Sequence, residues 1–178
     1  MSDVTQPQKN LKKELEEIIT GDVFDDEAAR EQYSTDASLF IIKPQLIVAP
    51  RDSADVQALV YYVATHPEKK LSLTGRSAGT DMTGGPLTES IVVSFTQYMN
   101  RIKAVGEGFA IAEPGVYYRD FEKATLAQGW LLPSYPASRE LCALGGMVSN
   151  NSGGEKTLTY GKTEDYVQQL KMVLRDGN

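Results

Sequence analysis

LTGRSAGTDMTGGPLTES, residues 73–90, is a glycine-rich stretch between two apolar runs. Its four glycines, at positions 75, 79, 84 and 85, can adopt positive φ and let the backbone approach a ligand without a Cβ in the way. Successive backbone amides in such a loop can also converge on an anion. The stretch therefore favours a phosphate cradle, and a solvent-exposed turn between two strands is the alternative that the glycines alone leave open.

Two familiar phosphate-binding loops do not match this stretch. A Walker A loop needs a lysine after its last glycine, and here none follows; Gly161-Lys162-Thr163 matches only the end of that motif, because Lys156 stands where its first glycine belongs. A Rossmann fingerprint opens into a helix, whereas this loop passes through Pro86 into the apolar run IVVSF at 91–95. Any phosphate bound here would be held mainly by the loop's own amides.

The composition is that of a globular protein. The chain has 178 residues, of which 41% are hydrophobic and 24% charged, and its net charge is -6. This sign disfavours nucleic acid and anionic membranes as partners, and no apolar run is long enough for a transmembrane segment. A single cysteine, Cys142, excludes an internal disulfide, and there is no cluster of cysteine and histidine for a metal ion. We expect a cytoplasmic protein without a metal site.

Apolar periodicity predicts a chain of mixed helices and strands. The helices are expected at 11–20, 25–33, 54–66 and 116–130, and the strands at 45–50, 70–74, 91–95 and 166–174, with a hairpin of two short strands within 101–115. Asp176-Gly177, a favoured hairpin pair, follows the last strand without a further strand to pair with it. We interpret the chain as a domain truncated at its C-terminal end, and expect the fragment to self-associate through the open edge of strand 166–174.

A second segment of small residues, ALGGMVSNNSGGEKTLTYGKT at 143–163, supports a binding role. Four glycines at 145, 146, 153 and 154 enclose serine and asparagine side chains, which offer both hydrogen-bond donors and acceptors. Two such loops in one domain could form a polar groove for an extended ligand such as a dinucleotide.

These motifs together resemble the FAD-linked oxidases of the vanillyl-alcohol oxidase superfamily. The similarity is nearest to the branch that contains the glycolate oxidase flavin subunit, D-lactate dehydrogenase and D-2-hydroxyglutarate dehydrogenase. It rests on RSAGT at 76–80, GG at 84–85 and MNRI at 99–102, with YSTDAS at 33–38, EPGV at 113–116, PASR at 136–139, LGG at 144–146, NSGG at 151–154, YGKT at 160–163 and DYV at 165–167. The resemblance covers residues 33–178 in consistent order.

The resemblance implies an α+β fold, the PCMH-type FAD-binding domain of two α+β subdomains with FAD between them. It divides the chain into an N-terminal helical segment at 1–32, a first FAD-binding subdomain at 33–100 and an incomplete second one at 101–178. The diphosphate would be wrapped by Arg76, Ser77, Ala78, Gly79, Thr80, Gly84 and Gly85. Pro114 and Gly115 would lie near the adenosine half, Ser138 near the flavin, and Gly145, Gly146, Asn150, Ser152 and Gly153 along the rest of the groove.

The function implied by the resemblance is oxidation of a 2-hydroxy acid such as D-lactate or glycolate, with hydride transfer to flavin N5. A small-molecule substrate and an unidentified electron acceptor are the expected partners. The family's substrate-binding groups lie in a C-terminal part outside this sequence, so no catalytic residue is assigned and the fragment alone is expected to be inactive. A flavin- or nucleotide-binding module without redox activity is the alternative, and a purely structural α+β domain is a third.

Two departures from the family pattern bear on the cofactor. Asp81 stands where glycine is common in this branch, which would put a carboxylate beside the diphosphate. Some members of the superfamily attach flavin to a histidine in the first loop, and none is present in residues 76–85. The resemblance therefore implies noncovalent FAD. Neither His66 nor Cys142 is assigned a role.

Overall fold

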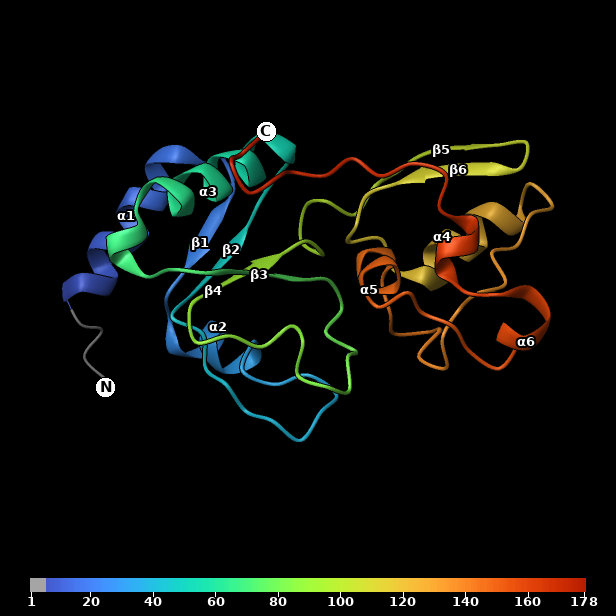
Figure 1. Cartoon of the computed structure of the whole chain (residues 1–178), viewed down its shortest axis with the longest axis horizontal. Helices are drawn as coiled ribbons and strands as arrows, with labels where there is room; N and C mark the ends of the chain where they lie inside the picture. The colour runs from blue at the N-terminus through green and yellow to red at the C-terminus, as the bar shows by residue number, and fades with distance from the viewer. Residues whose placement is uncertain (1–5) are drawn as a thin grey trace. The chain divides into compact units, whose positions relative to one another are not determined.

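The computed structural model describes residues 6–178 and divides into two compact units (Figure 1). The first unit contains the described residues up to 75 together with 81–94 and 172–178, and the second contains 76–80 and 95–171. Residues 1–5, the start of the expected helical segment 1–32, lie outside the described residues. The glycine-rich stretch 73–90 thus contributes to both units.

A four-stranded sheet in the order β1-β2-β4-β3 forms the centre of the first unit. The strands are β1 (Asp22–Phe24), β2 (Leu46–Ala49), β3 (Leu73–Arg76) and β4 (Ile91–Ser94). β1 is antiparallel to β2, and β2 is parallel to β4. Hydrogen bonds from the Ile91 amide to Ser72 O and from the Phe95 amide to Arg76 O keep one register, so β3 and β4 also run parallel.

Every residue of β2 and β4 is buried, as expected for central strands that are covered on both faces. The accompanying helices are α1 (Gln6–Ile18), α2 (Glu27–Gln32), α3 (Ser53–Thr65) and the short η1 (Pro67–Lys69). α3 starts at Ser53 because the carboxylate of Asp52 accepts the amides of Ala54 and Asp55, at 2.8 and 3.2 Å.

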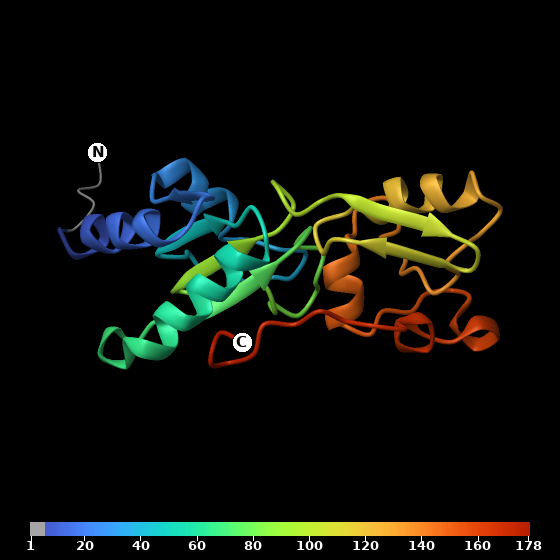
Figure 2. The ribbon, with the colours of Figure 1, turned by 90° about the horizontal axis from the view of Figure 1, so that it is seen from above.

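A β-hairpin and several short helices make up the second unit. They are β5 (Ile102–Gly106), β6 (Phe109–Ala112), α4 (Tyr118–Leu126), α5 (Leu144–Ser149), α6 (Thr157–Tyr160) and η2 (Thr163–Tyr166). Figure 2 shows β5 and β6 side by side, with α4 next to the hairpin. The turn between the strands contains Gly108 at φ 75°, which explains its glycine.

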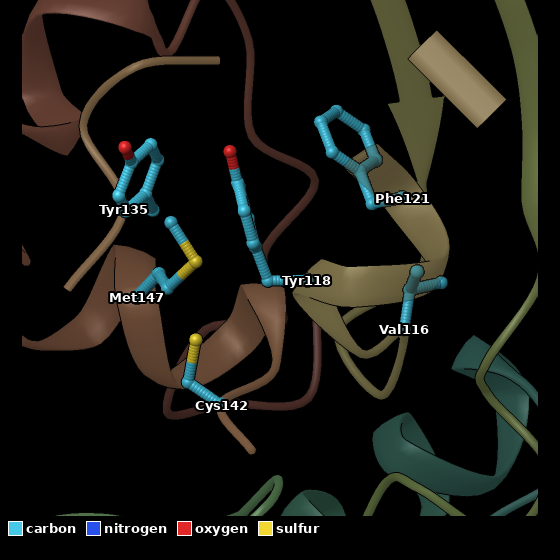
Figure 3. Packing of buried hydrophobic residues seen from close by; sticks show 6 residues of the cluster. All are labelled: Val116, Tyr118, Phe121, Tyr135, Cys142 and Met147. Carbon is cyan, nitrogen blue, oxygen red and sulfur yellow. The ribbon is translucent and has the colours of Figure 1, made fainter. Parts of the chain in front are cut away.

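The core of the second unit forms where α4 meets α5 (Figure 3). Its buried side chains are Val116, Tyr118, Phe121, Tyr135, Cys142 and Met147. Tyr118 is fully buried, and its hydroxyl donates to Leu132 O at 2.5 Å, so its polar end is satisfied inside an apolar cluster. Burial is the main cause that raises the Tyr118 pKa above its ordinary value.

The α+β fold expected from the sequence is confirmed, including strands at β2 and β4, the β5–β6 hairpin and the helices α3 and α4. Two predicted boundaries were wrong. The strand expected at 70–74 begins at Leu73, because Lys70 ends η1 with a left-handed backbone at φ 52°. The first helix, expected from residue 11, begins at Gln6, and Asn10 lies inside it and donates to Glu14.

The strand predicted at 166–174 is wrong. Part of it belongs to η2, and the remainder pairs with no strand in the described chain, so it lacks the hydrogen bonds that define a strand. The expected turn at Asp176-Gly177 is present: the Gly177 amide donates to Leu174 O at 2.8 Å, and Gly177 O accepts from Gln57 of α3. The strand edge on which the expected self-association was argued is therefore not formed by residues 166–174, and self-association itself stays a prediction.

The segment 144–149, read as part of a loop, is the helix α5. Its two glycines disfavour a helix, but the first-turn amides of Leu144 and Gly145 donate to Val116 O and Pro114 O, at 2.9 and 2.8 Å. Tertiary hydrogen bonds thus override local propensity. Across residues 6–178, no helix has both the length and the apolar character that crossing a membrane would need.

Candidate functional site

The loop that follows β3 presents backbone donors that the protein does not use. Within residues 6–178, the amide N–H groups of Ala78, Gly79 and Thr80 donate no hydrogen bond. Gly79 has φ 69°, a conformation that glycine adopts without strain. A Cβ added to it would lie 2.5 Å from Nη2 of Arg76, so the guanidinium packs against the Gly79 α-carbon. Unpaired amides beside a guanidinium are donors suited to an anion.

The carbonyl of Pro114 ties this loop to two other segments of the second unit. Pro114 O accepts hydrogen bonds from Ser77 Oγ at 3.0 Å and from the Gly145 amide at 2.8 Å. A Cβ on Gly145 would lie 2.6 Å from Ser77 Oγ and 2.9 Å from Pro114 O, so only glycine permits this approach. The structure thus brings together three residues that the sequence analysis assigned to the site from three separate motifs.

The backbone at Pro114-Gly115 is held from both sides. The Gly115 amide donates to Met99 O at 2.8 Å, and a Cβ there would lie 2.1 Å from Phe95 O. Glu113, which is 5% exposed, accepts from the Arg101 backbone amide and side chain and pairs with Lys103. Burial raises the pKa of Glu113, but the hydrogen bonds from Arg101 outweigh burial and bring the pKa below its ordinary value.

Ser138 opens a turn that is anchored by its neighbour. Ser138 O accepts the amides of Leu141 and Cys142, at 2.7 and 2.8 Å, while the side chain of Arg139 pairs with Glu122 of α4. Four residues earlier lies Ser134, which the sequence analysis did not single out. Its residue exposure is 1%, and its hydroxyl has no hydrogen-bond partner among the described residues. No sequence signal marks it, since a buried polar atom without a partner is visible only in three dimensions.

Most polar backbone groups of the second small-residue segment are used by the fold itself. The Asn150 amide donates to Gly146 O and the Ser152 amide to Met147 O, at 3.0 and 2.9 Å. Ser152 O accepts the amide and hydroxyl of Thr163, and a Cβ on Gly153 would lie 2.3 Å from Thr157 Oγ1. Gly146 differs, because nothing lies within 4 Å of the position of its Cβ.

Gly84 and Gly85 belong to the first unit, where the side chain of Asp81 accepts hydrogen bonds from their turn. Oδ2 of Asp81 accepts from the Gly85 amide at 2.8 Å, from the Thr83 amide at 3.1 Å and from Thr83 Oγ1 at 2.7 Å. Gly84 provides the positive φ of 86° that this turn requires. The amide of Gly85, expected to face a phosphate, therefore has an acceptor within the chain.

The surroundings of Cys142 and His66 indicate packing roles and not catalysis. Burial raises the pKa of the Cys142 thiol, which disfavours the reactive thiolate. The His66 ring stacks on Tyr62 with their centroids 4.4 Å apart, and its Nδ1 lies 2.8 Å from Tyr62 O. Among the described residues, no group of three or more histidine, cysteine, aspartate or glutamate side chains is placed to hold a metal ion.

Comparison with known proteins identifies the class to which this fold and these loops belong. Residues 44–178 match the FAD binding domain family, so the chain belongs to that family, with a PCMH-type FAD-binding domain. Its cofactor is FAD.

Two relatives agree with this assignment, and a solved structure shares the fold. The chain is 32% identical over 178 residues to D-2-hydroxyglutarate dehydrogenase of Escherichia coli K12, covering 98% of this chain and 18% of that protein. It is 32% identical over 175 residues to glycolate oxidase subunit GlcD of Bacillus subtilis 168, covering 96% and 37%. The fold superposes on alkyldihydroxyacetonephosphate synthase with a TM-score of 0.75 and 24% identity, covering 88% of this chain and 32% of that one. The chain thus spans well under half the length of these relatives.

Proposed function

We propose that this chain is the FAD-binding portion of a flavin-dependent oxidoreductase that oxidises a 2-hydroxy acid, such as D-lactate or glycolate. Membership of the FAD binding domain family supports the cofactor, and the names of the relatives, D-2-hydroxyglutarate dehydrogenase and a glycolate oxidase subunit, support the substrate class. The chain covers 18% and 37% of those two proteins, so the activity is proposed for a longer protein and not for these 178 residues alone.

The observation that carries the proposal is the set of unused amides at Ala78, Gly79 and Thr80 beside the Arg76 guanidinium. These groups fit the FAD diphosphate, which needs several donors and a positive charge. A hydrogen bond to a charged group is worth about 1.5–3 kcal/mol, so three amides would supply a large share of the binding energy. Ser77 holds the loop in place through its bond to Pro114 O.

The remaining site residues are proposed to line the cofactor. Pro114 and Gly115 are assigned to the adenosine half, Ser138 to the flavin, and Gly145, Gly146, Asn150, Ser152 and Gly153 to the rest. Since the amides of Gly145, Asn150 and Ser152 already have acceptors, their contribution would come from close backbone approach and side chains. Bound FAD supplies the hydride-accepting chemistry at N5, and no residue of this chain is assigned to catalysis.

Three further features belong to the proposal. FAD is bound noncovalently, because residues 73–90 contain neither histidine nor cysteine and Cys142 is buried. An electron acceptor is proposed as the second partner, beside the small-molecule substrate. The location is cytoplasmic, in keeping with one cysteine in 178 residues.

The test uses the complete protein, loaded with FAD under anaerobic conditions. D-lactate, glycolate and D-2-hydroxyglutarate are then added separately. We expect one of the three to bleach the visible flavin absorbance. Stable FAD binding without bleaching by any 2-hydroxy acid would favour the alternative, a flavin- or nucleotide-binding module without redox activity. Failure to bind flavin would contradict both. The 178-residue chain alone should show no dehydrogenase activity.

A further inference from the structure

The turn at residues 83–85 has the geometry of an anion site, and Asp81 supplies the anion. Two backbone amides and one hydroxyl converge on a single atom, Oδ2 of Asp81, over distances of 2.7–3.1 Å. Gly84, with φ 86°, gives the turn the concave backbone that commonly receives a phosphate oxygen. A Cβ on Gly85 would lie 3.1 Å from the same Oδ2, so the carboxylate sits directly over the turn.

Asp81 is itself fixed by its backbone. Asp81 O accepts the amide of Ala37 at 3.0 Å, and the turn is closed by the Leu87 amide, which donates to Gly84 O at 3.1 Å. The backbone of Asp81 is therefore held in place, and its carboxylate reaches forward to the amide of Thr83, two residues later. Charged acceptors form stronger hydrogen bonds than neutral ones, so a phosphate could gain these donors only by displacing the carboxylate.

The backbone amides of residues 78–80 differ from those of the turn at 83–85 in whether they have an acceptor. The amides of Ala78, Gly79 and Thr80 have no acceptor among residues 6–178, whereas those of Thr83 and Gly85 share one. A single glycine-rich stretch is thus divided into donors that remain available and donors that are already satisfied.

We propose that Asp81 is a resident anion that occupies the Thr83–Gly85 turn in place of a cofactor phosphate and thereby limits diphosphate binding to Ala78, Gly79 and Thr80. This inference rests on the proposed FAD site and names the residue that sets its affinity. Asp81 is a positioning residue: it keeps the turn closed without cofactor, and its negative charge keeps the affinity for FAD low.

The test follows individual backbone amides by NMR while inorganic pyrophosphate is added to the 178-residue chain. In the wild-type chain the resonances of residues 78–80 should shift and those of Thr83 and Gly85 should not. In Asp81→Ala the Thr83 and Gly85 resonances should shift as well. In the complete protein, the same variant should bind FAD about tenfold more tightly, as expected for one additional hydrogen bond to a charged group.

Two variants separate charge from geometry. Asp81→Asn keeps a side-chain oxygen for the turn and removes the charge, so its FAD affinity should lie between those of the wild type and Asp81→Ala. Asp176→Ala, which removes a carboxylate from the turn at Asn178, should leave FAD affinity unchanged and so controls for net charge.

Each outcome decides one of the two claims. Shifts of Thr83 and Gly85 in the wild-type chain, or FAD affinity that does not rise in either Asp81 variant, would overturn the role of Asp81. Shifts that are absent from residues 78–80 in every variant would instead contradict the proposed diphosphate site.

Discussion

Arg139 is joined to Glu122 by two hydrogen bonds, one from Nε to Oε2 at 3.1 Å and one from Nη2 to Oε1. Glu122 belongs to α4 and is 8% exposed, and Arg139 also lies over the ring of Tyr135, with 4.6 Å between its guanidinium carbon and the ring centroid. The arginine of the PASR motif therefore anchors the segment that carries Ser138 to the core of the second unit.

Replacing Glu122 by glutamine should destabilise the protein while preserving side-chain volume. The variant removes the charge that accepts from Arg139, and we expect a loss of about 1–3 kcal/mol in the free energy of unfolding. Thermal unfolding monitored by circular dichroism measures this. Glu27→Gln is the matched control, because Glu27 pairs with Lys43 on the surface and its replacement should leave the melting temperature unchanged. Equal effects of the two substitutions would contradict the anchoring role.

Two glycines of the expected site should respond in opposite ways to alanine. Gly115→Ala would place a Cβ 2.1 Å from Phe95 O, a backbone atom that cannot move aside, so the second unit should lose at least about 2 kcal/mol or fail to fold. Gly146→Ala meets nothing within 4 Å and lies inside α5, so it should be neutral or stabilising by up to about 1 kcal/mol. Denaturant unfolding of both variants compares them. A folded, fully stable Gly115→Ala protein would contradict the close packing of Gly115 against the carbonyl of Phe95.

Glu113 should contribute stability that is lost in acid. Its pKa is lowered in the folded protein, so its contribution is complete above the ordinary value of 4.5 and is lost as pH falls through the lowered pKa. Glu113→Gln should therefore be less stable than the wild type at neutral pH, and the two melting temperatures should converge below pH 4.5. A difference that stays constant across this range would indicate that the charge of Glu113 does not matter.

Noncovalent attachment of the flavin has a direct chemical test. Precipitating the FAD-loaded protein with acid should release the yellow colour into the supernatant, because the first loop has no histidine or cysteine and Cys142 is buried with a raised thiol pKa. A pellet that retains the flavin would require a covalent link. Mass spectrometry of the pellet would then locate the modified residue.

The sequence predicted the central elements well because their signals are local. Ile47 and Val92 lie in short, continuous apolar runs, and both runs became buried strands. The run around Leu170 is also rich in apolar residues, although polar residues interrupt it, and it pairs with no strand in the described chain. A strand forms only with a partner, and one sequence does not identify partners. α5 was missed for the converse reason: Gly145 disfavours a helix locally, and the acceptor that stabilises the helix start, Pro114 O, is 31 residues away (145 − 114).

The sequence predicts which loops form the candidate site, but not which of their hydrogen-bond donors remain available. Composition and order pointed to residues 76–85 and 143–163, and family membership is shown. Which amides remain available depends on hydrogen bonds that form only in the fold, as the contrast between Gly79 and Gly85 demonstrates. The carboxylate of Asp81 was recognised as a departure, while its place over the turn became visible only in the structure.

The central claim is that the FAD diphosphate binds to the amides of Ala78, Gly79 and Thr80, and the FAD dissociation constant of Gly79→Val in the complete protein tests it most directly. Valine disfavours φ 69° and would crowd the guanidinium of Arg76, so FAD should bind at least about tenfold more weakly. Gly129→Val, at φ 79° in the same unit but outside every loop of the site, controls for backbone strain and should leave the affinity unchanged. A folded Gly79→Val protein that binds FAD as tightly as the wild type would contradict the account.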